Sequence, residues 1–271
     1  MNISHVSTLE DFKTSHESFI AISTLWFKAH KAINSNVILH LPNANKGDGN
    51  LASIFAAMSY LLVKSNNLLI ILPKRFRSYR GPFFSDIFRV TTSRFLRDEF
   101  WEGGTELASF EPNKYFEFAS YLEKRAFNKY PRISSLVVDQ LKSFLAQLFV
   151  NACYHGASHS NIFICSSYRD NELKFTIVDC GQGFLRRVKQ VNHEIVNEEE
   201  AIIWSMRGNS VRGANGSGCL RLLTPYCLEN DGSLIVISGS TSVTVEKMNE
   251  YKVSNLPGPF RGAIISLSIK V

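Results

Sequence analysis

Apolar positions in the second half of the chain follow a helical period in some stretches and form short continuous runs in others. Apolar residues three and four apart predict helices at 114–128, 133–154, 198–206 and 217–228. Continuous apolar runs predict strands at 161–167, 173–178, 233–238 and 262–271. Two helices, then two strands, then helices and strands again predict an α/β sandwich rather than a doubly wound sheet.

The first third of the chain has the pattern of a strand, a helix and a second strand. The predicted elements are a strand at 37–41, a loop at 42–50, a helix at 51–63 and a strand at 68–72. Elements so close together favour a parallel strand pair in a small α/β domain. Gly103 and Gly104 punctuate a predicted connector at 98–113, which divides the chain into domains at 1–105 and 106–271.

The composition is that of a globular protein, with 45% apolar and 20% charged residues. No apolar stretch reaches the length of about 18 residues that a membrane span needs, and the first 20 residues lack the pattern of a signal peptide. The five cysteines show no metal-site spacing, and an odd number in apolar surroundings indicates reduced core residues. We therefore expect a cytoplasmic protein that does not cross a membrane.

The net charge of +6 is concentrated in one window, from Lys74 to Arg97. This basic window has seven cationic residues against the single acid Asp86, and aromatic residues lie between them. Such a patch can bind nucleic acid or an acidic protein surface. A solvated surface over a domain junction explains the same pattern.

Three motifs carry candidate chemistry, and the first lies on the helix predicted at 133–154. Gln147, Asn151 and His155 are four residues apart and share one face of that helix. Polar side chains on a mostly buried helix are costly unless they meet a partner. The amide oxygen of Asn151 can hold a hard cation such as Mg²⁺, or it can cap the next segment.

The second motif ends the strand predicted at 173–178. Asp179 follows the apolar run and precedes Gly181 and Gly183. A carboxylate at a strand end can accept a hydrogen bond from an exocyclic amine, and the glycines let the backbone approach a flat base. A tight turn explains Asp179 and Gly181 but gives no reason for Gly183.

The third motif is a glycine-rich loop at 208–218 that leads into a helix. It contains Ser210, Arg212, Gly213, Gly216 and Gly218. The start of the following helix offers unpaired N–H groups and a positive dipole end, which suit phosphate, and the arginine can add a charge-assisted contact. A hinge explains a glycine-rich loop equally well, so this motif gains its weight from the other two.

Together the three motifs resemble the N, G1 and G2 boxes of the GHKL ATPase superfamily, which includes DNA gyrase and the sensor histidine kinases. The resemblance covers about residues 114–271 and implies the Bergerat fold, with ATP held under a mobile lid. It implies that Asn151 coordinates Mg²⁺ and that Asp179 binds the adenine amine, with Gly181 and Gly183 beside the base. The lid and phosphate loop would comprise Ser210, Arg212, Gly213, Gly216 and Gly218.

Within the superfamily, the pattern is most similar to bacterial anti-sigma-factor kinases and related ATP-binding proteins, some of which carry a STAS-like domain. The shared features are Asn-Ala-x-x-His-Gly at 151–156, Glu-Glu-Ala-Ile at 199–202 and Asp-Gly-Ser-Leu-x-x-x-Ser-Gly at 231–239. By this likeness, residues 1–105 resemble a degenerate STAS-like domain and residues 106–271 a GHKL ATP-binding domain.

Two departures bear on activity. Many relatives have a glutamate as general base where this chain has Gln147, and a neutral amide can orient a water but cannot take its proton. Many also have Gly-Thr where this chain has Gly262 and Ala263, which lacks the hydroxyl. We therefore expect a regulatory ATP-binding protein that controls a protein partner, with slow or no hydrolysis. A serine or histidine protein kinase and an ATP-switched nucleic-acid-binding protein are the alternatives.

Overall fold

A computed structural model describes residues 2–7, 13–31, 35–41, 47–64, 69–73, 101–102, 107–128, 130, 133–155, 160–211 and 218–271. The basic window therefore lies outside the described residues, as do Arg212, Gly213 and Gly216 of the third motif.

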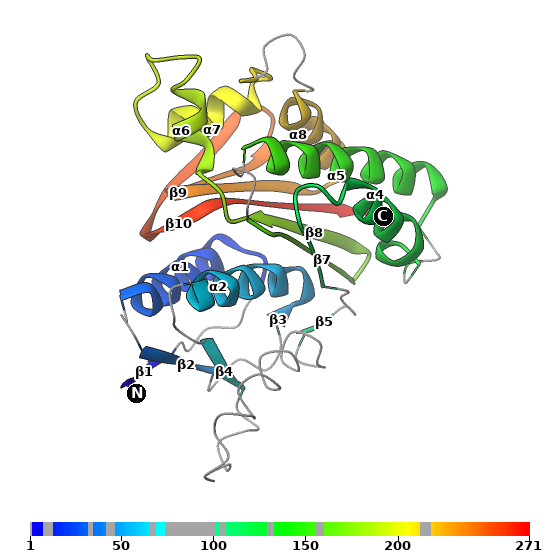
Figure 1. Ribbon diagram of the computed structural model, residues 1–271. Helices are drawn as coiled ribbons and strands as arrows, with labels where there is room; N and C mark the ends of the chain where they lie inside the picture. Colours follow the sequence, from blue (N-terminus) through cyan, green and yellow to red (C-terminus); the bar gives the residue numbers. More distant parts are fainter. Residues whose placement is uncertain are drawn as a thin grey trace.

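The centre of the fold is a five-stranded antiparallel sheet in the order β6-β7-β8-β10-β9 (Figure 1). Its strands are β6 (Ala108–Phe110), β7 (Ile162–Arg169), β8 (Glu172–Asp179), β9 (Ser233–Lys247) and β10 (Glu250–Lys270). Apolar residues alternate between the two faces of β8, because successive side chains of a strand point to opposite sides. Phe175 and Ile177 join the core on one face, and Val178 and Cys180 join the core on the other.

Helices from the second half of the chain cover the first of these faces. They are α4 (Tyr115–Tyr121) with a π-helical turn at Leu122–Ala126, α5 (Ser135–His155), α6 (Gly183–Val188), α7 (Glu198–Met206) and α8 (Cys219–Glu229). Phe118 of α4 and Phe149 of α5 stack with ring centroids 4.2 Å apart, which places an aromatic group at the centre of this core.

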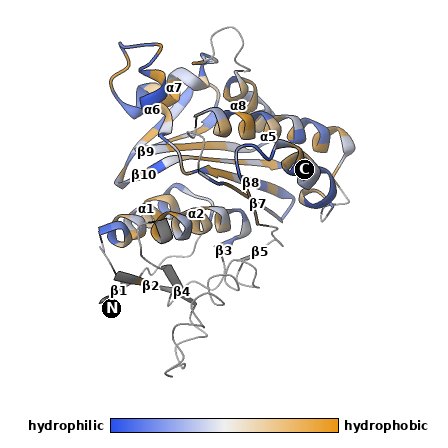
Figure 2. Ribbon diagram, in the orientation of Figure 1, coloured by the Kyte–Doolittle hydropathy of each residue, from blue (hydrophilic) through white to orange (hydrophobic). Residues whose placement is uncertain are grey.

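The N-terminal segment covers the opposite face with α1 (His16–Lys31) and α2 (Ala52–Lys64) (Figure 1). Behind these helices lies a parallel sheet in the order β1-β2-β4, formed by Asn2–Ser7, Ser35–Leu41 and Leu69–Pro73. A short turn of 3-10 helix at Gly49–Leu51 precedes α2, and β3 (Gly47–Asp48) pairs with β5 (Trp101–Glu102). Hydrophobic residues lie along the strands of the central sheet and along the helices on both sides of it (Figure 2).

One hydrophobic core crosses the boundary predicted after residue 105. Phe19, Trp26 and Phe55 of the N-terminal helices share a buried cluster with Phe163 and Ile264 of the central sheet. The two predicted domains are therefore in contact through a continuous apolar layer.

The mixed α/β fold is confirmed, and all the helices and strands predicted for the second half of the chain are present. Three predicted features of the N-terminal part are also present: the strands near 37–41 and 68–72, their parallel pairing and the helix near 51–63. The prediction missed β1, α1, β6 and α6, and it made β9 and β10 too short. The STAS-like and Bergerat assignments stay predictions. Among the described residues, no helix has the length and apolar character needed to cross a membrane.

Asn50 makes a buried polar link between the N-terminal segment and the central sheet. Its side chain is fully buried, and its Nδ2 donates to Thr176 Oγ1 at 2.8 Å. Its Oδ1 accepts hydrogen bonds from Ser167 Oγ at 3.0 Å and from Thr14 Oγ1 at 3.1 Å. Beside it, the Asp48 carboxylate lies 2.9 Å from Lys174 Nζ. These contacts fix the start of α2 against β7 and β8.

We expect Asn50→Ala to lower the free energy of unfolding by about 2–4 kcal/mol, because the buried hydroxyl groups of Ser167 and Thr176 and the half-buried hydroxyl of Thr14 lose a partner. Urea denaturation measures the change. Asn113→Ala removes an exposed amide in the turn before α4, and its effect should stay within about 0.5 kcal/mol. Equal stability of Asn50→Ala and the wild type would contradict this role.

Candidate functional site

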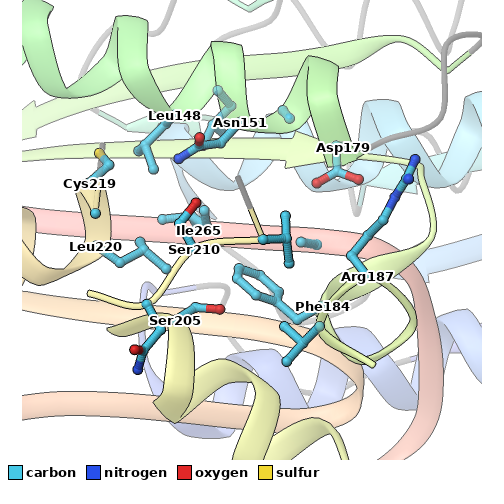
Figure 3. Close-up of a pocket in the computed structure, with 18 residues that line it drawn as sticks. Leu148, Asn151, Asp179, Phe184, Arg187, Ser205, Ser210, Cys219, Leu220 and Ile265 are labelled. Carbon is cyan, nitrogen blue, oxygen red and sulfur yellow. The ribbon is translucent and has the colours of Figure 1, made fainter. Parts of the chain in front are cut away.

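The three motifs meet at one pocket between the central sheet and its helices (Figure 3). Asn151 lines it from α5, Asp179 from the end of β8 and Gly183 from the start of α6, while Ser210 and Gly218 border the glycine-rich loop. Its empty volume of about 820 Å³ includes open solvent at the mouth. The kind of ligand is therefore better inferred from the residues that line the pocket than from its volume.

The other predicted site residues have different positions. Gly181 lies in the turn next to the pocket and donates its N–H to Asp179. Gln147 is not among the residues that line the pocket, and its Nε2 lies 3.4 Å from Ser143 Oγ on the preceding turn of α5. Its role in orienting a water stays a prediction. Of the loop, only the two ends can be placed, because residues 212–217 are outside the described part of the chain.

Asp179 is the buried carboxyl group of the pocket, with 9% of its surface exposed. Its Oδ1 accepts a hydrogen bond from Gly181 N at 2.9 Å, and the backbone N–H of Ala263 is a second donor. Burial raises the pKa of Asp179 to about 7, although both backbone donors act in the opposite direction. Near neutral pH the group therefore exists in both protonation states and responds strongly to any added donor.

Two glycines allow the turn after Asp179 to form. Gly262 of β10 has φ +100°, and a Cβ there would lie 2.0 Å from the backbone oxygen of Asp179. Gly183 has φ +75°, and a Cβ there would lie 2.6 Å from Ser238 Oγ. Both positions combine a left-handed backbone with close approach, which only glycine accepts without strain. The close approach at Gly183 gives the reason for this glycine that a simple tight turn does not provide.

Ser238 and Glu198 hold the start of α6 in place. Ser238 Oγ accepts a hydrogen bond from Phe184 N at 2.9 Å, and Glu198 Oε2 accepts one from Leu185 N at 3.2 Å. These side chains satisfy N–H groups that a helix leaves unpaired at its first turn. The family resemblance includes Ser238 in the pattern at 231–239 but gives it no role in the site, because its partner lies 54 residues away in the sequence.

The walls of the pocket are mostly apolar. Ile177 and Ile265 come from the sheet, and Phe184 and Val188 come from α6. Arg187 of α6 also lines the pocket, and in Figure 3 it appears at the same side of the view as Asp179. No motif pointed to Arg187, because a basic residue on a short helix carries no distinguishing signal.

The N-terminus of α8, which follows the glycine-rich loop in the sequence, lies at the pocket. Gly218 has φ +55° at the N-cap, and Cys219 and Leu220 open the helix and line the pocket with it. The first N–H groups of a helix have no intrahelical acceptor and carry the positive end of its dipole. Burial raises the pKa of the Cys219 thiol to about 12, so this cysteine is not a nucleophile at neutral pH.

Within the described ranges, no group of three or more His, Cys, Asp and Glu residues is arranged to hold a metal ion. No protein-family model matches the chain, and no curated protein matches it either. The geometry of the pocket is therefore the basis for a functional assignment.

We expect the stability of the protein to fall with increasing pH through the titration of Asp179. Its pKa is raised from the usual 3.8 to about 7, so the stabilisation is complete below about pH 4 and is lost as the pH rises through 7. Ionisation of the buried group costs on the order of 4 kcal/mol, since one pKa unit corresponds to about 1.4 kcal/mol.

Asp179→Asn removes this titration, so it should be more stable relative to the wild type at pH 8 than at pH 5. Urea denaturation at the two pH values measures the difference. An identical pH dependence in both proteins would show that Asp179 ionises freely.

Proposed function

We propose that this chain is an ATP-binding regulatory protein of the GHKL type. The observation that carries the proposal is the convergence of Asn151, Asp179 and Gly218 on one pocket. They come from three motifs and three elements of structure, and each supplies what a different part of a nucleotide requires.

The end of the pocket at Asp179 suits the adenine base. Its carboxylate can accept a hydrogen bond from the exocyclic amine, and the apolar side chains of Ile177, Phe184, Val188 and Ile265 offer surfaces to the flat ring. Because burial destabilises the charged form of Asp179, a ligand donor there is worth more than it would be in water. Ala263 has no hydroxyl that could contribute a hydrogen bond at the adenine site, so the Asp179 carboxylate would make most of the polar contact with the base.

The end formed by α8 suits phosphate groups. The helix N-terminus and the glycine-rich loop can together surround an anion with backbone N–H groups. Asn151 supplies a single amide oxygen, which fits a Mg²⁺ ion that arrives with the phosphates and keeps most of its water ligands. It does not fit a resident metal centre, which would need more protein ligands.

The lining favours binding over turnover. Asp179 is the only carboxylate among the described residues that line the pocket, and it is engaged at the base end by two backbone donors. Rapid hydrolysis needs a general base near the attacking water. We therefore assign the nucleotide a regulatory use, in which it closes the loop at 208–218 and alters the surface offered to a protein partner.

Mg-ATP titrated into the wild type by calorimetry should bind with micromolar affinity. Asp179→Asn should weaken binding at pH 8 at least about tenfold, because the charge-assisted hydrogen bond is lost. Asp139→Asn makes the same chemical change at an exposed position on α5 and should leave the affinity unchanged. Wild-type affinity should also rise between pH 6 and pH 8 more steeply than that of Asp179→Asn, because binding releases the proton of Asp179. Absence of binding to folded protein would refute the proposal.

Asn151→Ala tests the magnesium contact separately. In the wild type, Mg²⁺ should increase the affinity for ATP. In Asn151→Ala the factor of this increase should be about three- to tenfold smaller, while the affinity for metal-free ATP should change little. Gln140→Ala removes an exposed amide from the same helix and serves as the control. An unchanged magnesium increment in Asn151→Ala would show that this amide does not reach the metal.

A further inference from the structure

The N-terminal helix α1 contacts β10 where that strand leaves its regular pairing with β9. Asn255 pairs with Thr241 and Phe260 pairs with Gly239, so the residues of β10 between them bulge out of the ladder. Backbone groups freed by a bulge need other partners when they are buried. Gly258, in the middle of the bulge, is buried.

Side chains of α1 supply these partners. Ser23 Oγ donates to the carbonyl oxygen of Gly258 at 2.9 Å and accepts from its N–H at 3.2 Å. Trp26 Nε1 donates to the carbonyl oxygen of Pro259 at 2.9 Å. The helix also lies very close to the strand, because a Cβ on Gly258 would be 2.5 Å from the Cβ of Phe27. Side chains of α1 thus make the hydrogen bonds to the bulge backbone that a neighbouring strand makes in a regular sheet.

A second irregularity follows within three residues and touches the pocket. Phe260 pairs with Gly239 and Ala263 pairs with Ser238, so Arg261 and Gly262 are extra residues on β10. Gly262 is pressed against the backbone of Asp179, and Ala263 N–H bonds the Asp179 carboxylate. The Phe260 ring packs against Trp26 with centroids 6.0 Å apart, which joins the two irregularities.

We propose that Ser23 and Trp26 of α1 are positioning residues for the Asp179 carboxylate, so that the contact between the N-terminal layer and β10 governs nucleotide affinity. This inference rests on the proposed function. Hydrogen bonds join α1 to Gly258 and Pro259, and the backbone of β10 continues from there through Phe260 and Arg261 to Gly262 and Ala263. Gly262 and Ala263 then contact Asp179 directly. Strand β10 contacts α1 on one face of the sheet and α6, which lines the pocket, on the other face (Figure 1).

The coupling is reciprocal. If displacement of α1 lowers affinity for the nucleotide, then bound nucleotide strengthens the seating of α1 by the same factor. A protein partner that binds the N-terminal layer would therefore bind with an affinity that depends on whether the pocket contains nucleotide.

The test compares Ser23→Ala and Trp26→Phe with Thr24→Val in the full chain. Thr24 is the next residue on α1, and its hydroxyl donates to the carbonyl oxygen of Ile20, so Thr24→Val removes a hydroxyl whose hydrogen bond lies within the helix. Two properties are measured in folded protein: Mg-ATP affinity by calorimetry, and the pH midpoint of the Asp179 carboxyl carbon by NMR without nucleotide. Two other groups near Asp179 could also affect its titration. Arg187 of α6 lines the same pocket, and the Cys153 thiol on α5 has a pKa that the charge of Asp179 helps to raise. Arg187 and Cys153 are therefore left unchanged in all variants.

We expect Ser23→Ala and Trp26→Phe each to weaken Mg-ATP binding about three- to tenfold, the range of one lost hydrogen bond, and to move the Asp179 midpoint measurably. Thr24→Val should change neither property. Wild-type affinity and midpoint in both Ser23→Ala and Trp26→Phe would overturn the proposal, as would equal effects of all three variants. If the wild type binds no nucleotide, the proposed function fails, and the carboxyl titration alone decides whether α1 positions Asp179.

Discussion

A carboxyl group buried at the end of β8 is the constraint on which the site depends. An ionised carboxylate without water is costly, and the protein offsets that cost only in part with the N–H groups of Gly181 and Ala263. The turn that supplies the first donor exists only because Gly262 leaves room for it. A carboxyl group that is buried at the wall of a pocket, with a pKa raised by that burial, is a candidate for contact with a ligand.

The layered fold explains how such a site can communicate with the rest of the chain. Strands β8 and β10 are covered on both faces, so each carries residues of the pocket on one side and contacts of the N-terminal helices on the other. On β8, Thr176 faces Asn50, and the neighbouring Ile177 faces the pocket. A displacement of either face therefore moves a strand that belongs to both, because close-packed layers shift together.

Local motifs made much of this site predictable from the sequence. Asn151, Asp179, Gly183 and Gly218 were identified because helix periodicity, a strand end and a helix start each leave a short-range pattern. Ser238 and Gly262 were noted only through the family resemblance and were given no role in the Asp179 turn, since that role depends on contacts between distant parts of the sequence. The extent of β9 and β10 was missed because Gly239, Pro257 and Gly258 read as breaks, whereas the structure accommodates them as bulges. Helix α1 was not predicted, although Phe19, Ile22, Trp26 and Ala29 have helical spacing and form its buried face.

The same bulges argue against treating the N-terminal layer as an independent attachment. Removal of α1 from the sheet would leave the N–H and C=O of Gly258 and the C=O of Pro259 without their partners, in addition to exposing the apolar cluster around Trp26 and Phe260. The backbone of this part of β10 has its hydrogen-bond partners on α1, so its conformation is stable only when α1 is packed against it. The pocket lies beside the next part of β10, because Ala263 follows the second bulge and lines the pocket. The N-terminal layer is thus part of what makes β10 adopt the shape that the Asp179 turn requires. Under the proposed function, a regulator that acts on that layer would need no contact with the nucleotide to alter its binding.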